Sequence, residues 1–313
     1  MCTITQGNAT QNNSALVIQH IEQSQGFMQT AKQSVSITQT NDSGSNFLRV
    51  FQTINQSTHD QDVNGKQTQS NLQHVALTPF GLDGPGLSQM SSTGSNFAEL
   101  TQDSTQAGNN ASVQNQTADQ FAGDSGSGNG INQTTTGGSN SAALTHIQQQ
   151  QLDNSASQTQ TATQDGDITQ NGAAGANLAS GSQSQDQKEN GPAGADQHQT
   201  GDPRCCSVQA TGGTFVIRQA TNQFANNPTS GQQSEIIVGN CDSPPNGCTV
   251  TQSATVNGTT TTGIPCNAQP SCHKEISCGE GECFAFTPDS SVAVRLSDSS
   301  PAARLTGSVT RLT

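Results

Sequence analysis

The residues of this chain that could do chemistry are few and lie far apart. Ser125 stands in the Gly-rich segment "GDSGSG" at 123–128, a place where a nucleophilic serine could sit. Such a serine needs a His and an Asp that a packed core holds beside it. The chain has six scattered histidines and few apolar residues, so we interpret this segment as a loop and predict no catalytic residue.

Candidate metal ligands are also poorly grouped. Asp165 and Asp167 lie two residues apart in "DGDITQNG" at 165–172, but the further oxygen ligands of a calcium loop are missing. We interpret this pair as part of a solvated turn. Four histidines show no metal-ligand spacing: His20, His59, His74 and His198. The sequence therefore predicts no metal and no cofactor.

The composition argues against the core of a conventional enzyme. Leu, Ile, Val and Phe make up 50 of the 313 residues, and Trp and Tyr are absent. That share is below the ~20% under which a chain usually cannot bury enough apolar surface to offset its ordering entropy. Polar residues take their place, among them 41 Gln. A Gln/Asn-rich chain with few charges forms either a disordered tract or an ordered stack of β-strands.

Charge and hydropathy limit the partners that we expect. The formal net charge is -13, and residues 1–200 hold four basic residues, Lys32, Arg49, Lys66 and Lys188. Binding of nucleic acid needs many more of them. No apolar run approaches the ~18 residues of a membrane span. The first residues, "MCTITQGN", contain no basic region and no apolar stretch, so no signal peptide is visible.

A repeat with strict spacing runs through the polar sequence. Ile or Leu, any residue and then Gln recurs at six places, with 33, 50, 44, 37 and 49 residues between successive glutamines. An Asn follows seven residues after each Gln, a Gln or His six residues after that, and in most copies a further Gln 14 residues later. A seventh copy starts at Val250-Thr251-Gln252.

These positions define four predicted columns of residues. The first contains Gln6, Gln39, Gln89, Gln133, Gln170 and Gln219, and the second contains Asn13, Asn46, Asn96, Asn140, Asn177 and Asn226. The third contains Gln19, Gln52, Gln102, His146, Gln183 and Gln232. The fourth contains Gln33, Gln116, Gln160 and Gln197, with Lys66 and Asn246 in the two other copies.

Alternation within the repeat predicts strands. In "NFAELTQ" at 96–102, Asn96, Ala98, Leu100 and Gln102 share one face of an extended segment. Glycines two residues before the Asn predict a tight turn with positive φ: Gly44, Gly94, Gly138 and Gly175. Each copy is therefore predicted as strand, turn and strand, with insertions placed before the next anchor.

Stacking of the copies explains why the register is kept. With strands ~4.8 Å apart, each amide would lie over the same amide of the next copy. A buried amide without a partner costs about 1–3 kcal/mol, so a shift in register is penalised. We therefore expect an all-β fold, either a β-solenoid or stacked, cross-β-like strand-turn-strand repeats with Gln/Asn ladders. The alternative is that the glutamines are simply common and exposed.

Four segments resemble the curlin repeat of bacterial functional amyloids: "GSNSAALTH", "GSNFAELTQ", "GNNASVQNQ" and "DNSASQTQ". In that family a Gly-Asn turn precedes an Asn-x-Ala-x-x-x-Gln strand. The resemblance covers about residues 4–200 and extends weakly to 262. It implies an extracellular fibre subunit that polymerises end to end. The present chain departs from the family in its longer, less regular period and in its cysteine-rich end.

The C-terminal part holds eight of the nine cysteines: Cys205, Cys206, Cys241, Cys248, Cys266, Cys272, Cys278 and Cys283. An even count predicts four disulfides, with Cys241 and Cys248 pairing across the turn "DSPPNG" and the other pairings left open. Zinc is disfavoured because no Cys-x-x-Cys pair occurs. The disulfides would staple and cap the last copies, or that end would form the subunit junction. Cys2 either links chains or plays no role.

We therefore predict three regions. Residues 1–200 form the Gln/Asn-rich repeat region, 201–290 a cysteine-rich continuation and cap, and 291–313, which include "VAVRL", a final strand or tail. The predicted function is a structural subunit of an extracellular fibre or biofilm matrix, without catalysis, located outside the cell or at its surface. Its expected partners are other copies of itself. The alternatives are a monomeric β-solenoid binding module (adhesin or ice-binding) and a disordered surface spacer.

Overall fold

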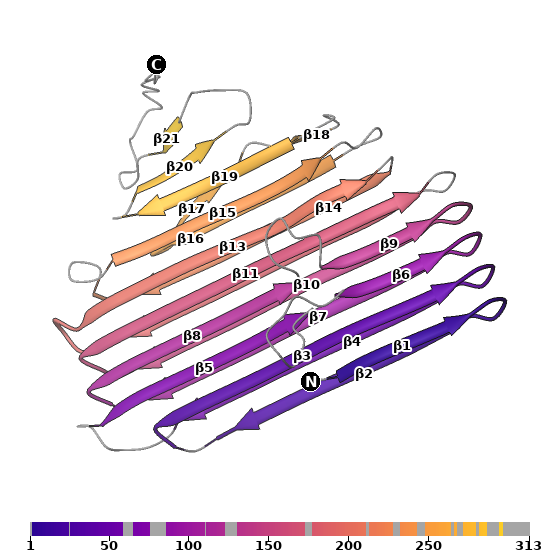
Figure 1. Ribbon diagram of the computed structural model, residues 1–313. Coiled ribbons are helices and arrows are strands. Elements are labelled where there is room, and N and C mark those ends of the chain that lie inside the picture. Colours follow the sequence, from indigo (N-terminus) through magenta and orange to yellow (C-terminus); the bar gives the residue numbers. More distant parts are fainter. Residues whose placement is uncertain are drawn as a thin grey trace.

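The structure is a computed structural model. The structure describes residues 2–24, 26–58, 65–75, 86–109, 111–122, 130–172, 177–210, 213–227, 232–242, 248–263, 266–267, 272–279, 282–286 and 294–296. Throughout this part of the chain the regular structure is β-strand (Figure 1). A search of these residues for a helix long and apolar enough to cross a membrane finds none.

The strands divide between two sheets, which we call sheet A and sheet B. Sheet A contains β1 (Cys2–Asn8), β3 (Met28–Asn41), β5 (Lys66–Val75), β6 (Leu87–Ser91), β8 (Val113–Ala122), β9 (Ile131–Thr135), β11 (Ser157–Gly172), β13 (Asp196–Ala210), β15 (Gln232–Asp242), β19 (Cys272–Gly279), β20 (Glu282–Phe286) and β21 (Val294–Leu296). Sheet B contains β2 (Asn13–Gln23), β4 (Asn46–Thr58), β7 (Asn96–Asn109), β10 (Asn140–Asp153), β12 (Asn177–Asn190), β14 (Thr214–Ala225), β16 (Cys248–Val256), β17 (Thr259–Thr262) and β18 (Cys266–Asn267).

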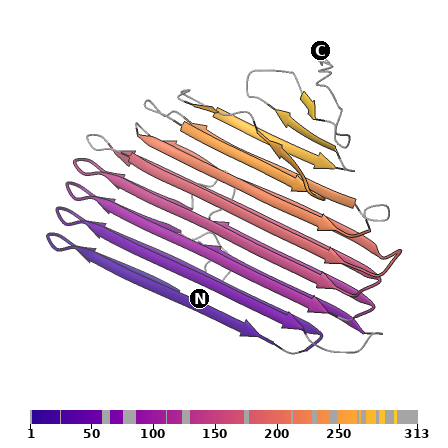
Figure 2. The ribbon, with the colours of Figure 1, turned by 180° about the vertical axis from the view of Figure 1, so that it is seen from behind.

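The chain alternates between the sheets and advances by one strand each time. We call one row of sheet A and the sheet B strand that follows it a layer. Layers 1 to 7 are β1 with β2, β3 with β4, β5 and β6 with β7, β8 and β9 with β10, β11 with β12, β13 with β14, and β15 with β16. Neighbouring layers pair in parallel, and the colours of Figures 1 and 2 change steadily along the stack.

Two insertions interrupt sheet A in the middle of a strand. In layer 3, Val75 pairs with Val35 and Leu87 with Ile37, and Gly86 O accepts from Ile37 N, so Gly86 continues the row opposite Ser36 and the extra residues are 76–85. In layer 4, Gly130 continues the row in the same way, because its carbonyl accepts from Leu87 N, and the extra residues between β8 and β9 are 123–129. The sequence analysis predicted that insertions come directly before the Ile/Leu-x-Gln anchors, and both insertions lie there in the sequence. Pairing is in register on both sides of each insertion point, so these points lie within a row of sheet A and not at the turn between the sheets.

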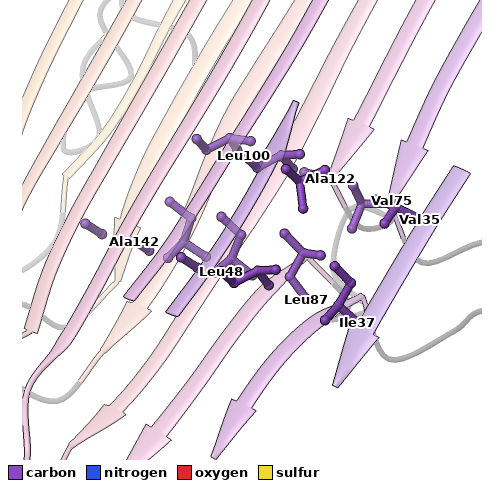
Figure 3. Close-up of a cluster of buried hydrophobic side chains, with 14 of the residues drawn as sticks. Val35, Ile37, Leu48, Val75, Leu87, Leu100, Ala122 and Ala142 are labelled. Atoms are coloured by element: carbon purple, nitrogen blue, oxygen red, sulfur yellow. The ribbon is translucent and has the colours of Figure 1, made fainter. Parts of the chain in front are cut away.

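A narrow apolar core runs through the stack between the two sheets. Its side chains form columns, such as Ile37, Leu87, Ile131 and Ile168 in sheet A, all fully buried. These face Leu48, Leu100 and other residues of sheet B (Figure 3). Because each layer contributes only a few residues to one shared core, 50 large aliphatic and Phe residues in 313 suffice for an ordered stack.

The turns from sheet A to sheet B stack closely, and the prediction of positive φ for their glycines is wrong. The glycines with positive φ among the described residues lie elsewhere, at 26, 86, 194, 213 and 258. A Cβ on Gly94 would lie 1.9 Å from Gly44 O, and one on Gly138 would lie 2.1 Å from Gly94 O. Glycine is needed here for close approach between turns. Gly175 lies outside the described residues.

The two ends of the stack differ. At layer 7, β19 pairs antiparallel with β15, and β17 and β18 pair antiparallel with β16. The predicted strand in "VAVRL" is observed as β21, which pairs with β20. At layer 1, no described strand pairs with the outer side of β1 or β2. The predicted region boundary at residue 200 falls inside β13, so the stack continues across it.

Substitution at the stacked turns tests their close approach. We expect Gly138→Ala to lower the free energy of unfolding by about 3 kcal/mol, because backbone atoms of the adjacent turn must move to accommodate the methyl group. Gly137→Ala is the matched control, since a Cβ there would meet its nearest atom at 3.5 Å. Chemical denaturation followed by circular dichroism measures both. Equal effects of the two substitutions would contradict this account.

Candidate functional site: the amide columns and the open edge

The asparagine column is continuous through five layers. Asn13 donates through Nδ2 to Asn46 Oδ1 at 2.9 Å, Asn46 to Asn96 at 2.9 Å, Asn96 to Asn140 at 2.9 Å and Asn140 to Asn177 at 3.0 Å. The same nitrogens also donate to backbone carbonyl oxygens of sheet A, for example Asn46 to Met90 O at 2.9 Å. The column therefore joins layers along the stack and joins the two sheets across it.

In the first glutamine column each amide also makes two hydrogen bonds, one along the stack and one to the other sheet, but it donates in the opposite direction along the stack. Gln39 donates to Gln6, Gln89 to Gln39, Gln133 to Gln89 and Gln170 to Gln133, at Nε2–Oε1 distances of 2.7, 2.8, 2.8 and 2.8 Å. Each nitrogen also donates to a carbonyl of sheet B, as Gln89 does to Phe97 O at 2.8 Å. Glutamine N–H groups thus point toward layer 1, whereas asparagine N–H groups point away from it.

The sixth predicted copy of the repeat was assigned to the wrong positions. Gln219 lies in sheet B and donates to Gln183 at 3.0 Å, so it belongs to the third column and not to the first. Asn226 follows β14 and bonds the backbone of Gly191. Gln232 lies at the start of β15 in sheet A, where it pairs with His198. The Ile-x-Gln anchor occurs in strands of both sheets, so the anchor alone does not identify the sheet.

The third column runs through sheet B and extends further than predicted. Gln52 donates to Gln19 at 2.7 Å and Gln102 to Gln52 at 2.8 Å. After His146, the column continues through Gln183 and Gln219 to Gln252, which donates to Gln219 at 2.9 Å. The anchor of the predicted seventh copy is therefore the last member of this column.

His146 occupies a glutamine position and interrupts the bonding. Its Nδ1 lies 3.4 Å from Gln183 Nε2. On the other side, Gln102 Oε1 and His146 Nε2 are buried and have no hydrogen-bond partner. Burial lowers the pKa of His146 to about 3. The imidazole is therefore neutral at pH 7, and it leaves one bond of the column unmade.

The fourth predicted column separates into several. Gln160 donates to Gln116 at 3.0 Å, as predicted, but Gln33 accepts from Gln73 at 3.2 Å in a neighbouring column. Gln197 donates to Gln158 at 2.8 Å in yet another. Lys66 is exposed at the start of β5 and lies opposite Val113. Asn246 lies outside the described residues. The connections before these strands vary in length, so a constant spacing of 14 residues after the third column did not identify equivalent positions.

Several columns were not predicted in this form, although Gln33, Gln116 and Gln160 were placed together in the fourth predicted column. One contains Gln29, Gln69, Gln116, Gln160 and Gln199. Another contains Gln33, Gln73, Gln120 and Gln164, and a third contains Gln23, Gln56, Gln106, Gln150, Gln187 and Gln223. The signal was present as Gln-x-x-x-Gln in "QTAKQ", "QSNLQ", "QTADQ" and "QTATQ", because residues four apart on a strand share a face.

Two carboxyl groups in layer 5 have strongly raised pKa values. Burial, with a smaller contribution from Asp196, raises the pKa of Glu189 to about 9, and neither of its oxygens has a partner. Burial and the neighbouring Asp167 raise the pKa of Asp165 to about 7. The interpretation of Asp165 and Asp167 as a solvated turn is wrong, since both lie within β11.

The other candidate ligands do not come together. No group of three His, Cys, Asp or Glu side chains within the described ranges could hold a metal ion. His20 is exposed, His198 lies 3.0 Å from Asp196, and His74 packs near Phe121. His59 and Ser125 lie outside the described residues.

Of the eight disulfide candidates, Cys248 has a described side chain, which is buried in the apolar core. Cys2 is a free thiol at the start of β1. Backbone register places Cys241 opposite Cys272 and Cys278 opposite Cys283. Cys248 is disulfide-bonded, and the pairings of the eight cysteines remain a prediction.

The open edge at layer 1 is lined by the ends of glutamine columns. Gln6, Gln19 and Gln23 each donate to one carbonyl oxygen of the neighbouring sheet, at 3.0, 3.2 and 3.1 Å. In later layers the equivalent glutamine also uses its second N–H to donate to the glutamine of the preceding layer. For layer 1, the described chain contains no preceding layer. Exposed apolar side chains gather in the first layers, with Met28 at 81%, Ile18 at 69% and Leu16 at 62% exposure.

Comparisons with protein-family models, curated proteins and solved structures find no match for this chain. The resemblance to curlin repeats therefore depends on the residues of the repeat alone.

Replacement of His146 by Gln tests the column. A glutamine side chain at this position can donate to Gln102 Oε1, so we expect His146→Gln to raise the free energy of unfolding at pH 7 by about 1–3 kcal/mol. The dependence of the free energy of unfolding on pH, below about pH 6.5, changes as well. In the unfolded chain His146 takes up a proton below about pH 6.5, whereas in the folded chain its pKa is about 3. The wild type therefore loses up to about 1.4 kcal/mol per pH unit over that range, and the variant lacks this loss.

Denaturation at several pH values measures both effects. His20→Gln is the control, because His20 is exposed on the outer face of β2. Two outcomes would show that His146 does not interrupt the column. One is a loss of stability below pH 6.5 that is the same in His146→Gln as in the wild type, and the other is an equal increase in the free energy of unfolding in His20→Gln.

Proposed function

We propose that this chain is a structural subunit of an extracellular fibre or matrix, a β-solenoid that assembles by strand stacking and performs no catalysis. One observation supports this proposal most strongly. The glutamine columns reach layer 1 with N–H groups of Gln6, Gln19 and Gln23 directed toward a layer that the described chain does not supply. An edge of this kind is a template for further strands.

The exposed side chains of the first layers favour the same use of this edge. Among the residues that the structure describes, six of the eight exposed large hydrophobic side chains belong to residues 16–90, namely Leu16, Ile18, Phe27, Met28, Phe47 and Met90. They lie on the outer faces of both sheets in the first layers, with Leu16, Ile18 and Phe47 on sheet B and Met28 and Met90 on sheet A, and exposed apolar side chains of this kind are typical of an interaction surface. In the proposed assembly, a neighbouring subunit covers the layer 1 edge.

The other end of the stack is proposed as the stapled junction. Directly opposite residues of antiparallel strands have Cα atoms about 4.5–5.5 Å apart, which a disulfide can bridge. We therefore propose the pairings Cys241–Cys272 and Cys278–Cys283 from their register, in place of Cys241–Cys248. They would fix β19 and β20 as the surface on which the open edge of the next subunit docks.

Filament formation tests the proposed function. Purified protein at high concentration is expected to form filaments with a ~4.8 Å meridional spacing in fibre diffraction. In β2 the N–H of Asn13 donates to Ser45 O in layer 2, so the N–H of Ile18, an even-numbered residue, faces the open side. Ile18→Pro should abolish filaments without loss of folding, because it removes a donor that is needed only for addition.

Ile18→Thr, which keeps the N–H, is the matched control and should form filaments. Electron microscopy and analytical ultracentrifugation provide the readouts. Wild-type protein that stays monodisperse at high concentration would count against the proposal, as would filaments of unchanged yield from Ile18→Pro.

A second candidate function is a monomeric binding module. The outer face of sheet A contains one complete hydroxyl column, formed by Thr30, Ser70, Thr117, Thr161 and Thr200. The neighbouring column is mixed, with Lys32, Leu72 and Asp119 among its members. If this face binds ice, we expect thermal hysteresis that Thr161→Lys reduces and that the sheet B control Thr145→Lys leaves unchanged. No hysteresis in the wild type would exclude ice binding.

A further inference from the structure

The outer face of sheet B carries apolar side chains over layers 1 to 3. Leu16, Ile18 and Phe47 are 62, 69 and 46% exposed, and Phe51 and Phe97 are half-buried. These five residues lie side by side through the pairing of β2, β4 and β7, and we call them the apolar patch. In layer 4 the same columns continue with smaller side chains, Ser141, Ala143 and Thr145. The patch is therefore confined to the first three layers of the described stack.

The exposure of the patch is a property of the sheet face and not of the edge at layer 1. Strand β4 pairs with β2 on one side and with β7 on the other, and β7 also pairs with β10. Phe47, Phe51 and Phe97 therefore lie on interior strands. Their side chains project from the face, where backbone pairing with another layer cannot cover them.

A charged pair lies in the middle of the patch. Arg49 lies between Phe47 and Phe51 on β4, and its Nε is 3.1 Å from Glu99 Oε2 on β7. The guanidinium Cζ also lies 5.7 Å from the centre of the Phe97 ring. The Arg49 side chain is 60% exposed, so this ion pair adds little to the stability of a single chain. It does place two opposite charges in one column, in neighbouring layers.

The charges and the side-chain sizes of the patch are self-complementary about one two-fold axis. This axis runs parallel to the strands, in front of the face, between β4 and β7. A second copy related by it places its layer 3 over layer 2 and its layer 4 over layer 1, column by column. Arg49 then faces the partner's Glu99, and Phe47 faces the partner's Phe97. Each copy contributes both pairs, so four charges alternate in sign around the axis.

Large side chains of one copy face small side chains of the other at the remaining positions of the patch. Leu16 faces the partner's Ala143 and Phe51 faces the partner's Thr101, while Ile18 also faces a threonine of the partner subunit. Side chains that alternate in this way can interdigitate between two sheets ~10 Å apart and exclude water. Four layers along the 13 residues of β4 cover roughly 800 Å², which is the area that each partner buries in a stable interface of standard size.

The other simple face-to-face arrangement is opposed by charge. A two-fold axis along the stacking direction, through the column of Arg49, keeps every layer opposite itself. Arg49 would then face the partner's Arg49, and Glu99 would face the partner's Glu99. Like charges that face one another across an interface oppose association. In the first arrangement, the other acidic residues of β2 and β7, Glu22 and Asp103, face uncharged side chains.

We propose that the apolar patch is the contact surface between two copies of this chain, which pack face to face with their stacks in opposite directions. The contact is made by side chains of sheet B and requires no strand addition. It therefore does not rest on the layer 1 edge that carries the proposed function. Within the pair, the rings of Phe47 and Phe97 and the charges of Arg49 and Glu99 lie closest to the two-fold axis, so these residues contribute most of the affinity.

The dissociation constant of the pair is the first test, measured by sedimentation of the full chain below the concentration at which filaments form. We expect a reversible dimer for the wild type. Phe97→Ser introduces the residue that layer 4 has in this column. It should weaken the dimer at least roughly tenfold, because an aromatic contact is lost twice in each pair.

Leu178→Ser is the matched control, and it should change the dissociation constant less than about twofold. Leu178 is 49% exposed in the same column as Phe97, but it lies in layer 5, beyond the four layers that overlap. Equal effects of the two substitutions overturn the proposal. A wild type that stays monomeric overturns it as well and leaves the face to a partner of other chemistry.

Charge variants distinguish contact between copies from the ion pair within one copy. Arg49→Glu makes both central positions negative and Glu99→Arg makes both positive, so each variant alone should dimerise at least roughly tenfold more weakly than the wild type. An equimolar mixture of the two should recover dimers with one chain of each kind, because every negative position then faces a positive one. Circular dichroism of each variant alone checks that the fold is retained. Absence of mixed dimers overturns the proposal.

Photo-cross-linking tests the direction of the pair. A chain with Phe51→p-benzoylphenylalanine is mixed with a heavy-isotope-labelled wild-type chain and illuminated, and tandem mass spectrometry locates the adducts on the labelled chain. The proposed arrangement predicts adducts on β7 near Thr101. The arrangement with parallel stacks predicts adducts on β4 near Phe47, and that result overturns the direction proposed here. Dimers without filaments would refute the proposed function alone, and filaments from chains that do not pair would refute this inference alone.

Discussion

The two N–H groups of the primary amide hold this structure together. In each glutamine column one N–H bonds the same residue of the neighbouring layer, and the other bonds a backbone carbonyl of the opposite sheet. Gln106 is typical, donating to Gln56 Oε1 at 2.8 Å and to Thr117 O at 3.0 Å. A hydroxyl or a carboxylate cannot make both bonds, because neither has two N–H or O–H donors. Two polar sheets can therefore face one another at close range with a core of only a few apolar columns.

This bonding makes the register of the stack a collective property. A shift by one residue in any strand would turn its whole amide set to the outside, and neighbouring layers would lose their partners as well. Positions that depart from the amide pattern have visible consequences. His146 leaves Gln102 Oε1 without a donor, and Glu189 is buried with a pKa near 9. His146 stands between Gln102 and Gln183, where the amide pattern is intact, whereas Glu189 lies between Leu152 and Ala225, which offer its carboxyl group no hydrogen bond.

Much of the stack could be predicted from spacing, because the columns of layers 1 to 5 preserve it. The asparagine column from Asn13 to Asn177 and the glutamine column from Gln6 to Gln170 follow from constant offsets between Ile-x-Gln and Asn. The prediction failed at Gln219 because strands of both sheets alternate with the same period of two. The conformation of Gly94 was also missed, since contact between turns of different layers is invisible in a local sequence pattern.

The common direction of the glutamine columns has an electrical consequence. Each amide carries a dipole of about 3.5 D, and in the columns headed by Gln6, Gln19 and Gln23 these dipoles add along the stacking axis. The single asparagine column opposes them only in part. The stack is thus a polar object whose layer 1 face is its positive pole, although the chain as a whole carries a net charge of -13. Its two faces should differ in their affinity for ions and charged surfaces, much as the two termini of an α-helix do.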